Sequence, residues 1–211
     1  MRTTIVSALA LLLAFGVACS SDPKPAGEAP KPEAAVREPE KPKAAEYETG
    51  RTAFQKLYIS ARSFAADAKP YRLQSEYTEG APSMDGKASL WRAQFASASR
   101  QRLKAYSWSG MPDGGVSAGS EDTYNPNNAS TRVFEVPFLK VDSDKAFEVA
   151  QKNGGEKITK KNPGQPITYM LDFDSRGGRL VWHVIYGESP MKAQLRLLVD
   201  ATTGQFVGRE R

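Results

Sequence analysis

The sequence predicts an α+β fold made of a tandem repeat of two units, each with one helix packed on an antiparallel sheet of three to four strands. Two segments, residues 51–66 and 142–152, carry apolar side chains at helical spacing. Each is followed by runs in which apolar and polar side chains alternate, as they do in half-buried strands. Because the order of a helix followed by strands occurs twice, we interpret the body as an internal duplication.

The first predicted unit covers residues 51–139. Its helix carries an apolar stripe of Phe54, Leu57, Tyr58, Ala61 and Ala65. Residues 71–77, 91–95 and 103–108 alternate as strands, and Asp85-Gly86 is a turn signal. Residues 110–131 are rich in Gly, Ser, Asn and Asp and are predicted to form a long loop. Residues 132–139 are predicted to be the unit's last strand, at a sheet edge because Pro137 has no amide hydrogen.

The second predicted unit covers residues 140–211. Its helix begins with Asp142 or Ser143 as N-cap and ends before Gly154. Strands are predicted at residues 167–173, 180–186 and 195–199. Residues 200–204 then form a hairpin turn with Gly204 at the left-handed position, followed by a short closing strand at residues 205–207. The sequence leaves open whether the two helices cover one continuous sheet or two separate ones.

The two units match at a few positions. Residues 52–54 correspond to residues 145–147, and Leu90-Trp91 corresponds to Val181-Trp182. Both tryptophans lie in a middle strand, on the face that a helix should cover. They are either two core anchors at matching positions or a platform for a ligand.

The second unit resembles the PepSY domain. The residues that carry this resemblance are the helix at 144–150, the strand at 180–186 and the ending at 198–207. The first unit resembles the family only weakly, because it lacks that ending. PepSY domains are small α+β units, often in tandem, that occur in propeptides of thermolysin-type metalloproteases and in envelope proteins. The resemblance implies a non-enzymatic protein that inhibits or restrains a peptidase, with no catalytic residues to carry over.

The N-terminus has the features of an export signal. Residues 5–18 are apolar or small apart from Ser7, and this stretch is too short to span a bilayer. It ends in Gly16-Val17-Ala18-Cys19, which resembles the lipobox of bacterial lipoproteins, with Gly16 where leucine is usual. The resemblance implies that residues 1–18 are a signal peptide and that Cys19 carries lipid. Ser20 after the cysteine, rather than aspartate, implies the outer membrane, facing the periplasm. The alternative is an ordinary signal peptide followed by a cysteine without a partner.

Residues 19–50 are predicted to be a disordered spacer. They contain six prolines and otherwise mostly Ala, Glu and Lys, so they cannot bury enough apolar surface to offset the entropy of ordering. The body at residues 51–211 holds 23 of the 29 basic and 17 of the 24 acidic side chains, a net charge of +6. For an exported protein this charge favours anionic headgroups, cell-wall polymers or acidic proteins over nucleic acid as partners. A solvated basic surface explains it equally well.

The inventory of reactive side chains predicts that the protein is not an enzyme and binds no metal or cofactor. His183 is the only histidine, and no Gly-x-Ser-x-Gly elbow or phosphate-binding loop is present. With Cys19 outside the body, carboxylates would have to supply nearly every ligand of a zinc site. Asp172 and Asp174 lie two apart on a strand and could hold calcium, or form a solvated strand end beside Arg176.

One surface is predicted to bind a partner. If the alternation holds in both strands, Arg92, Arg102 and Lys104 lie on the face opposite Trp91, with Trp108 nearby. We therefore expect a lipid-anchored periplasmic binding module that contacts an envelope protein, and the PepSY resemblance implies that it restrains a peptidase. The alternatives are a structural accessory subunit of an envelope complex, or a module that binds a small ligand or lipid between its two units.

Overall fold

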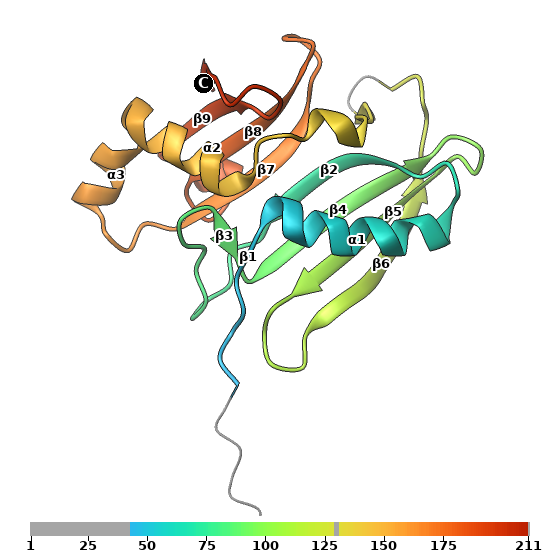
Figure 1. Cartoon of the computed structure of the whole chain (residues 1–211), viewed down its shortest axis with the longest axis horizontal. Coiled ribbons are helices and arrows are strands. Elements are labelled where there is room, and N and C mark those ends of the chain that lie inside the picture. Colours follow the sequence, from blue (N-terminus) through green and yellow to red (C-terminus); the bar gives the residue numbers. More distant parts are fainter. Residues whose placement is uncertain (1–42, 129–130, 211) are drawn as a thin grey trace, which may run out of the picture. The chain divides into compact units, whose positions relative to one another are not determined.

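Eight antiparallel strands form one continuous sheet in the computed structural model, which describes residues 43–128 and 131–210 (Figure 1). Their order across the sheet is β10-β9-β8-β7-β2-β4-β5-β6. The bounds are β2 (Lys69–Ser75), β4 (Leu90–Ser97), β5 (Arg102–Ser109), β6 (Gly115–Thr123), β7 (Ile167–Asp174), β8 (Arg179–Tyr186), β9 (Leu195–Asp200) and β10 (Phe206–Arg209). A separate two-stranded sheet pairs β1 (Glu48–Thr49) with β3 (Lys87–Ala88).

The strands of the two predicted units meet at β2 and β7. These two strands pair antiparallel, with Leu73 opposite Leu171 at the centre of the contact. The first four strands of the large sheet in chain order therefore lie on one side of this seam, and the last four lie on the other side. One mixed α+β body with a continuous antiparallel sheet results, and this settles the question that the sequence left open.

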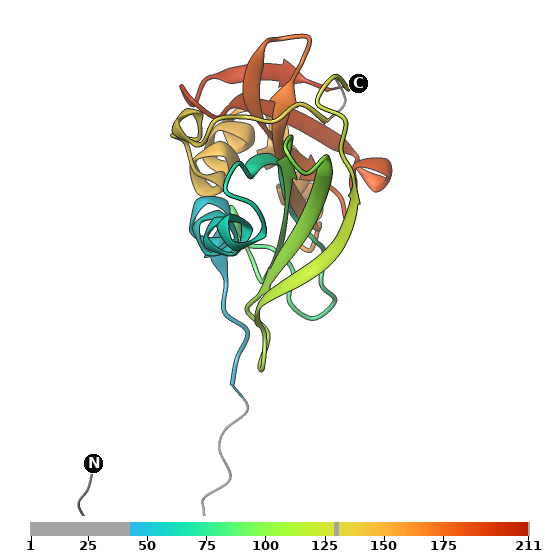
Figure 2. The same ribbon diagram turned by 90° about the vertical axis from the view of Figure 1, so that its right-hand side faces the viewer.

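The helices cover one face of the sheet. Helix α1 (Gly50–Phe64) packs over β2, β4 and β5, and α2 (Ser143–Ala150) packs over β8 and β9 (Figures 1 and 2). A kinked turn, η3 (Gln151–Gly155), with non-helical φ/ψ values at Asn153 and Gly154, joins α2 to α3 (Glu156–Lys161). Two short 3-10 helices, η2 (Val136–Phe138) and η4 (Pro190–Lys192), lie in connections.

The hydrophobic core lies between these helices and the sheet. Alternate residues of the strands point into it, which is why the apolar residues recur at every second position. Its largest fully buried side chains on this face are Trp91, Trp182, Tyr169, Tyr186, Phe95, Leu57, Leu73, Leu171 and Leu197. Burial of each large apolar side chain contributes about 1.5–3 kcal/mol, so this layer dominates the stability of the body.

Two predictions for residues 110–139 were wrong. Nine residues of the predicted loop form strand β6, which pairs with β5 along the sheet edge and is exposed at every position. With no buried face, β6 shows no apolar alternation. The predicted last strand at residues 132–139 is instead an extended segment that leads into η2. Pro137 lacks an amide hydrogen, and the edge position beside β5 is already taken by β6.

The two predicted helices are present, and each ends two residues earlier than predicted. The helix predicted at residues 142–152 begins at its predicted cap, where the Asp142 side chain accepts a hydrogen bond from Ser143 N. As predicted, the helix ends before Gly154, because Asn153 and Gly154 have non-helical φ/ψ values. A further helix, α3, follows this kink, so the second half has more than the one helix predicted. The predicted spacer also ends earlier than residue 50, since β1 pairs with β3 and Gly50 is buried at the start of α1.

Candidate binding groove and charged cluster

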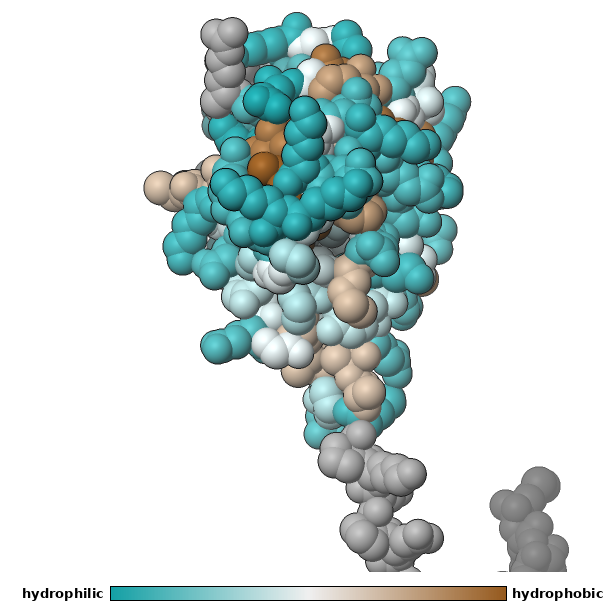
Figure 3. All heavy atoms as spheres, turned by 90° about the vertical axis from the view of Figure 1, so that its left-hand side faces the viewer, coloured by the Kyte–Doolittle hydropathy of each residue, from teal (hydrophilic) through white to brown (hydrophobic). Residues whose placement is uncertain are grey.

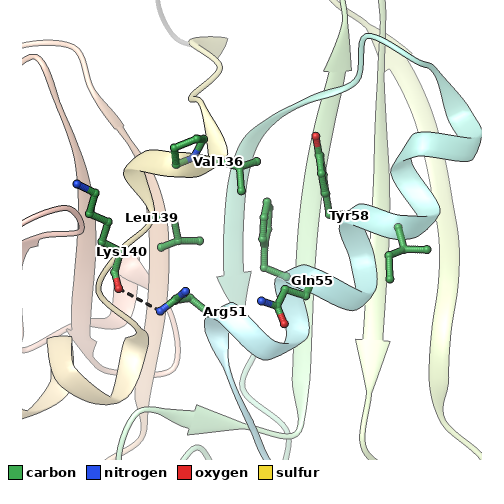
Figure 4. Close-up of a pocket in the computed structure, with 9 residues that line it drawn as sticks. Arg51, Gln55, Tyr58, Val136, Leu139 and Lys140 are labelled. Carbon is green, nitrogen blue, oxygen red and sulfur yellow. Dashed lines mark hydrogen bonds between the residues drawn. The ribbon is translucent and has the colours of Figure 1, made fainter.

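A groove of about 700 Å³ lies between α1 and the segment that contains η2. Side chains of α1 form one wall, and Val136 and Leu139 face them from the other (Figure 4). Its lining residues are Arg51, Phe54, Gln55, Tyr58, Ile59, Val136, Pro137, Leu139 and Lys140. Most of this surface is aliphatic or aromatic, so the groove suits an apolar group.

The apolar stripe of α1 forms the first wall of the groove. Phe54 and Leu57 point into the core, and Tyr58 lies one position further round the helix, half-exposed at the groove. The rings of Phe54 and Tyr58 stack with centroids 5.6 Å apart, which fixes the tyrosine against the wall. The opposite wall is shaped by Pro137, which starts the 3-10 turn η2.

One end of the groove is basic. The Arg51 guanidinium donates a hydrogen bond of 3.1 Å to the Lys140 backbone carbonyl oxygen, and the Lys140 side chain extends away from this bond (Figure 4). At the rim Ile59 is 73% exposed, and the neighbouring Phe138 is 51% exposed. These exposed apolar side chains beside an apolar groove are typical of a binding surface. None of the lining residues is a histidine, cysteine, serine or carboxylate.

The other candidate site is a charged cluster on the face of the sheet that the helices do not cover. His183 Nε2 lies 3.0 Å from Asp172 Oδ1, and His183 Nδ1 lies 3.0 Å from Glu210 Oε2. Arg72 Nη2 donates to the other oxygen of Asp172 at 3.1 Å, and Arg196 Nη1 lies 3.5 Å from Glu210. Beside this cluster is an open hollow lined on its rim by Phe173, Asp174, Ser175, Arg176, Leu198 and Arg209.

The two carboxylates keep His183 charged. Burial disfavours the imidazolium, but hydrogen bonds and charge from Asp172 and Glu210 outweigh it and raise the pKa of His183 to about 9. Burial also opposes the charge on Asp172, yet His183 and Arg72 hold the pKa of that carboxyl below its usual value. Hydrogen bonding to His183 lowers the pKa of Glu210. An imidazolium held in this way cannot accept a proton at neutral pH, so His183 is not placed to act as a general base.

The two aspartates that could have held calcium have other roles. Asp172 binds His183 and Arg72, as described above. Asp174 accepts hydrogen bonds from the backbone N–H groups of Arg176 and Gly177 at 2.9 and 3.0 Å, and so shapes the turn between β7 and β8. Within residues 43–128 and 131–210, no group of three His, Cys, Asp or Glu side chains is placed to hold a metal ion.

The predicted binding face is not assembled as expected. Cross-strand pairing places Trp108 opposite Trp91, Lys104 opposite Phe95 and Arg102 opposite Ser97, so these three lie on the helix-covered face. Only Arg92 lies on the opposite face, near Glu76. Trp108 is buried, and Lys104 pairs with Glu121 at 2.8 Å. The prediction that Arg92, Arg102 and Lys104 share one face was therefore wrong, and the register of the β4-β5 hairpin is the reason.

Cys19, the predicted lipidation site, lies outside the described residues, as do the predicted signal peptide and most of the predicted spacer. In the part of the chain that the structure describes, no helix is long and apolar enough to cross a membrane. Sequence reasoning missed the groove, because its two walls lie about 80 residues apart along the chain and one of them was predicted to be a strand.

Comparison with known proteins found a similar fold but no matching family. No protein-family model matches the sequence, so the resemblance of residues 140–208 to the PepSY domain gains no support there, and no curated protein matches it either. Among solved structures, the chain is similar to the crystal structure of a "putative lipoprotein" from Clostridium difficile 630, with a TM-score of 0.50 and 11% sequence identity. The similarity covers 75% of this chain and 91% of that one, so it extends over most of the body but shows the fold alone.

Proposed function

We propose that this chain is a lipid-anchored, non-enzymatic binding module of the bacterial cell envelope, and that it binds a protein partner in the groove beside α1. The observation that carries the proposal is the combination of an apolar groove, exposed Ile59 and Phe138 nearby, and a basic end formed by Arg51 and Lys140. These features suit a partner segment that inserts an apolar side chain and places a carboxylate beside Arg51 or Lys140.

The export signal and the lipobox-like residues before Cys19 support the envelope location. The similar solved structure, itself described as a putative lipoprotein, is consistent with it. Attachment to the outer membrane, facing the periplasm, rests on Ser20 alone. A peptidase as the restrained partner rests on the PepSY resemblance alone, and both remain proposals.

We also propose that the body arose by duplication of one PepSY-like unit. Each half has a helix followed by four strands of the large sheet, and the two sets run outward from the seam in the same chain order. Trp91 and Trp182 each donate their indole N–H to a carbonyl oxygen two residues before the first residue of a helix, Glu48 before α1 and Val141 before α2. Equivalent bonds at equivalent positions are what a duplicated unit would retain.

Each alternative function would require a different structural feature. A ligand held between the two units would need an opening at their junction. The core of that junction is closed, because Trp91 and Trp182 are both 0% exposed and pack against each other there, and the opening at the seam is a pocket of about 400 Å³ lined by residues of β2, β7 and η4. A purely structural subunit would need no open groove. An enzyme would need a base, and His183 is held as a cation between two carboxylates.

Site-specific photo-crosslinking in cells tests the binding proposal. A photoreactive side chain at Gln55, which is exposed in the groove, should give a discrete crosslinked protein, and the additional change Ile59→Glu should abolish it. The matched control places the same photoreactive side chain at Ser117, which is exposed on β6 outside the groove. Identical adducts from both positions, or none from Gln55, would rule out the groove as the partner site.

A further inference from the structure

A second pocket, of about 410 Å³, lies beside the turn between α2 and α3. It shares no residue with the groove. Its lining residues are Lys152, Asn153, Gly154, Lys157, Ile158, Gln194, Leu195 and Arg209. Three of these eight side chains are cationic, and no aspartate or glutamate lines the pocket.

The turn that carries the two lysines is fixed by the core. Gly155 is buried so closely against β8 that a Cβ atom there would lie 1.7 Å from the Tyr186 hydroxyl oxygen. The same hydroxyl donates a hydrogen bond of 2.9 Å to the Gln151 side chain. Lys152 and Lys157 therefore flank a turn whose backbone is held in place, and their Cα positions are set before any ligand arrives.

Arg209 reaches this turn from the end of β10. Its Nη2 atom lies 3.7 Å from the position that a Cβ atom on Gly154 would occupy. Gly154 has a φ of +121°, a conformation in which a side chain is strained, and the absence of one leaves room for the guanidinium. Cations from two distant parts of the chain thus converge on one pocket.

These three cations lack acidic partners. Seven lysines of the described chain form ion pairs: Lys43, Lys56, Lys69, Lys104, Lys145, Lys160 and Lys192. Lys152, Lys157 and Arg209 form none within the described residues. The nearest acidic side chains along the sequence, Glu148, Glu156 and Glu210, are already paired with Lys145, with Lys160, and with His183 and Arg196. The hydrogen bond from Lys145 lowers the pKa of Glu148 most and the charge of Lys152 contributes to that shift, but Lys152 and Glu148 form no ion pair. The local charge is therefore strongly positive.

The pocket also has apolar side chains. Leu195 is buried and Ile158 is half-buried, and both line it. Low-dielectric walls beside unpaired cations strengthen the field that an anion meets. The surface on the side of the body where α3 lies is mainly hydrophilic and contains a hollow with hydrophobic side chains at its bottom (Figure 3).

We propose that this pocket binds a phosphate group, carried either by a phospholipid headgroup or by a soluble phosphate compound. A phosphate offers several oxygens in a tetrahedral arrangement, so it can accept hydrogen bonds from one guanidinium and two ammonium groups at once. A single carboxylate would leave part of that positive charge unmatched. The site is independent of the groove and of the lipid anchor, so it stands or falls separately from the proposed function.

Binding measurements on the purified full chain, in non-ionic detergent and at low ionic strength, test this inference. The probes are inorganic phosphate, glycerophosphoglycerol as the deacylated headgroup, and acetate. The double variant Lys152→Ala/Lys157→Ala should weaken phosphate binding by roughly tenfold or more, because two charge-assisted hydrogen bonds are lost. Arg209→Ala should weaken it similarly.

The matched control is Lys145→Ala/Lys160→Ala, which removes two exposed lysines from the same helices, both of them ion-paired. This control should bind phosphate like the unchanged chain. Tighter binding of glycerophosphoglycerol than of inorganic phosphate would identify the headgroup as the source, and the reverse would identify soluble phosphate. The proposal is overturned if neither probe binds, if acetate binds equally well, or if the control variant loses as much affinity as the pocket variant.

Discussion

The indole rings of Trp91 and Trp182 meet edge to face, with centroids 6.3 Å apart and planes at 72°. Each indole N–H donates a hydrogen bond of 2.9 Å to the chain just before a helix, to Glu48 O and to Val141 O. The two rings thus link the start of α1 to the start of α2 through the centre of the core. Gly50 lies beside them, and a Cβ atom there would lie 2.5 Å from the Trp182 ring.

We expect Trp91→Phe and Trp182→Phe each to lower the free energy of unfolding by about 2 kcal/mol, because each change removes packing volume and leaves a buried carbonyl without its donor. Urea-induced unfolding measures both effects. The double variant should lose less than the sum of the two single variants, by roughly 0.5–1.5 kcal/mol, because the contact between the rings can be lost only once. Additive losses would mean that the edge-to-face contact contributes nothing measurable.

Two glycines test how tightly the turn before α3 is packed. Gly155→Ala should destabilise the body by about 2–4 kcal/mol, since its new methyl group would overlap the Tyr186 hydroxyl and that ring is fully buried. Gly164→Ala is the control, because no atom lies within 4 Å of the position of its Cβ, and we expect a change of only about 0.5 kcal/mol or less. Thermal unfolding distinguishes them, and equal melting temperatures would contradict the packing of η3 on β8.

Much of the large sheet could be predicted from the sequence because one of its faces is buried. The alternations in β4, β7 and β8 reflect side chains that point in turn to the core and away from it, and these strands were predicted nearly in full. The turn before β10 was also predicted, with Gly204 at a φ of +77°. Strand β6 has no buried face, so its sequence lacks the apolar alternation that would predict a strand. Backbone pairing with β5 places it in the sheet.

The candidate sites could not be predicted from local sequence patterns, because they depend on strand register and on contacts between residues far apart in the chain. Register decides which residues of β5 share a face with Trp91, and a shift of one residue moves every side chain to the opposite face. This is why Arg102, Lys104 and Trp108 were assigned to the wrong face. The partners of His183 come from β7 and from the residue after β10, so the charge on that histidine depends on contacts that only the folded chain creates.

Lipid attachment is testable at Cys19. The change Cys19→Ala should abolish incorporation of labelled palmitate and move the protein from the membrane fraction to the soluble fraction, because no other cysteine can carry the lipid. Cell fractionation and labelling in the producing bacterium measure both effects. Ser20→Asp serves as a control that leaves acylation intact. Membrane association that survives Cys19→Ala would mean that residues 1–18 or the basic body hold the protein there instead.

His183 should make stability depend on pH in the alkaline range. Its pKa is about 9 in the folded chain against 6.5 for an ordinary histidine, so its contribution is fully present below pH 6.5 and is lost as the pH rises through 9. The shift corresponds to roughly 3 kcal/mol at most. In His183→Gln we expect a lower free energy of unfolding at pH 6 and little further decline up to pH 9. Glu210→Gln should lose only part of the effect, because Asp172 still faces the ring. Urea unfolding at successive pH values measures these slopes, and a decline in His183→Gln as steep as in the unchanged chain would show that another group titrates there.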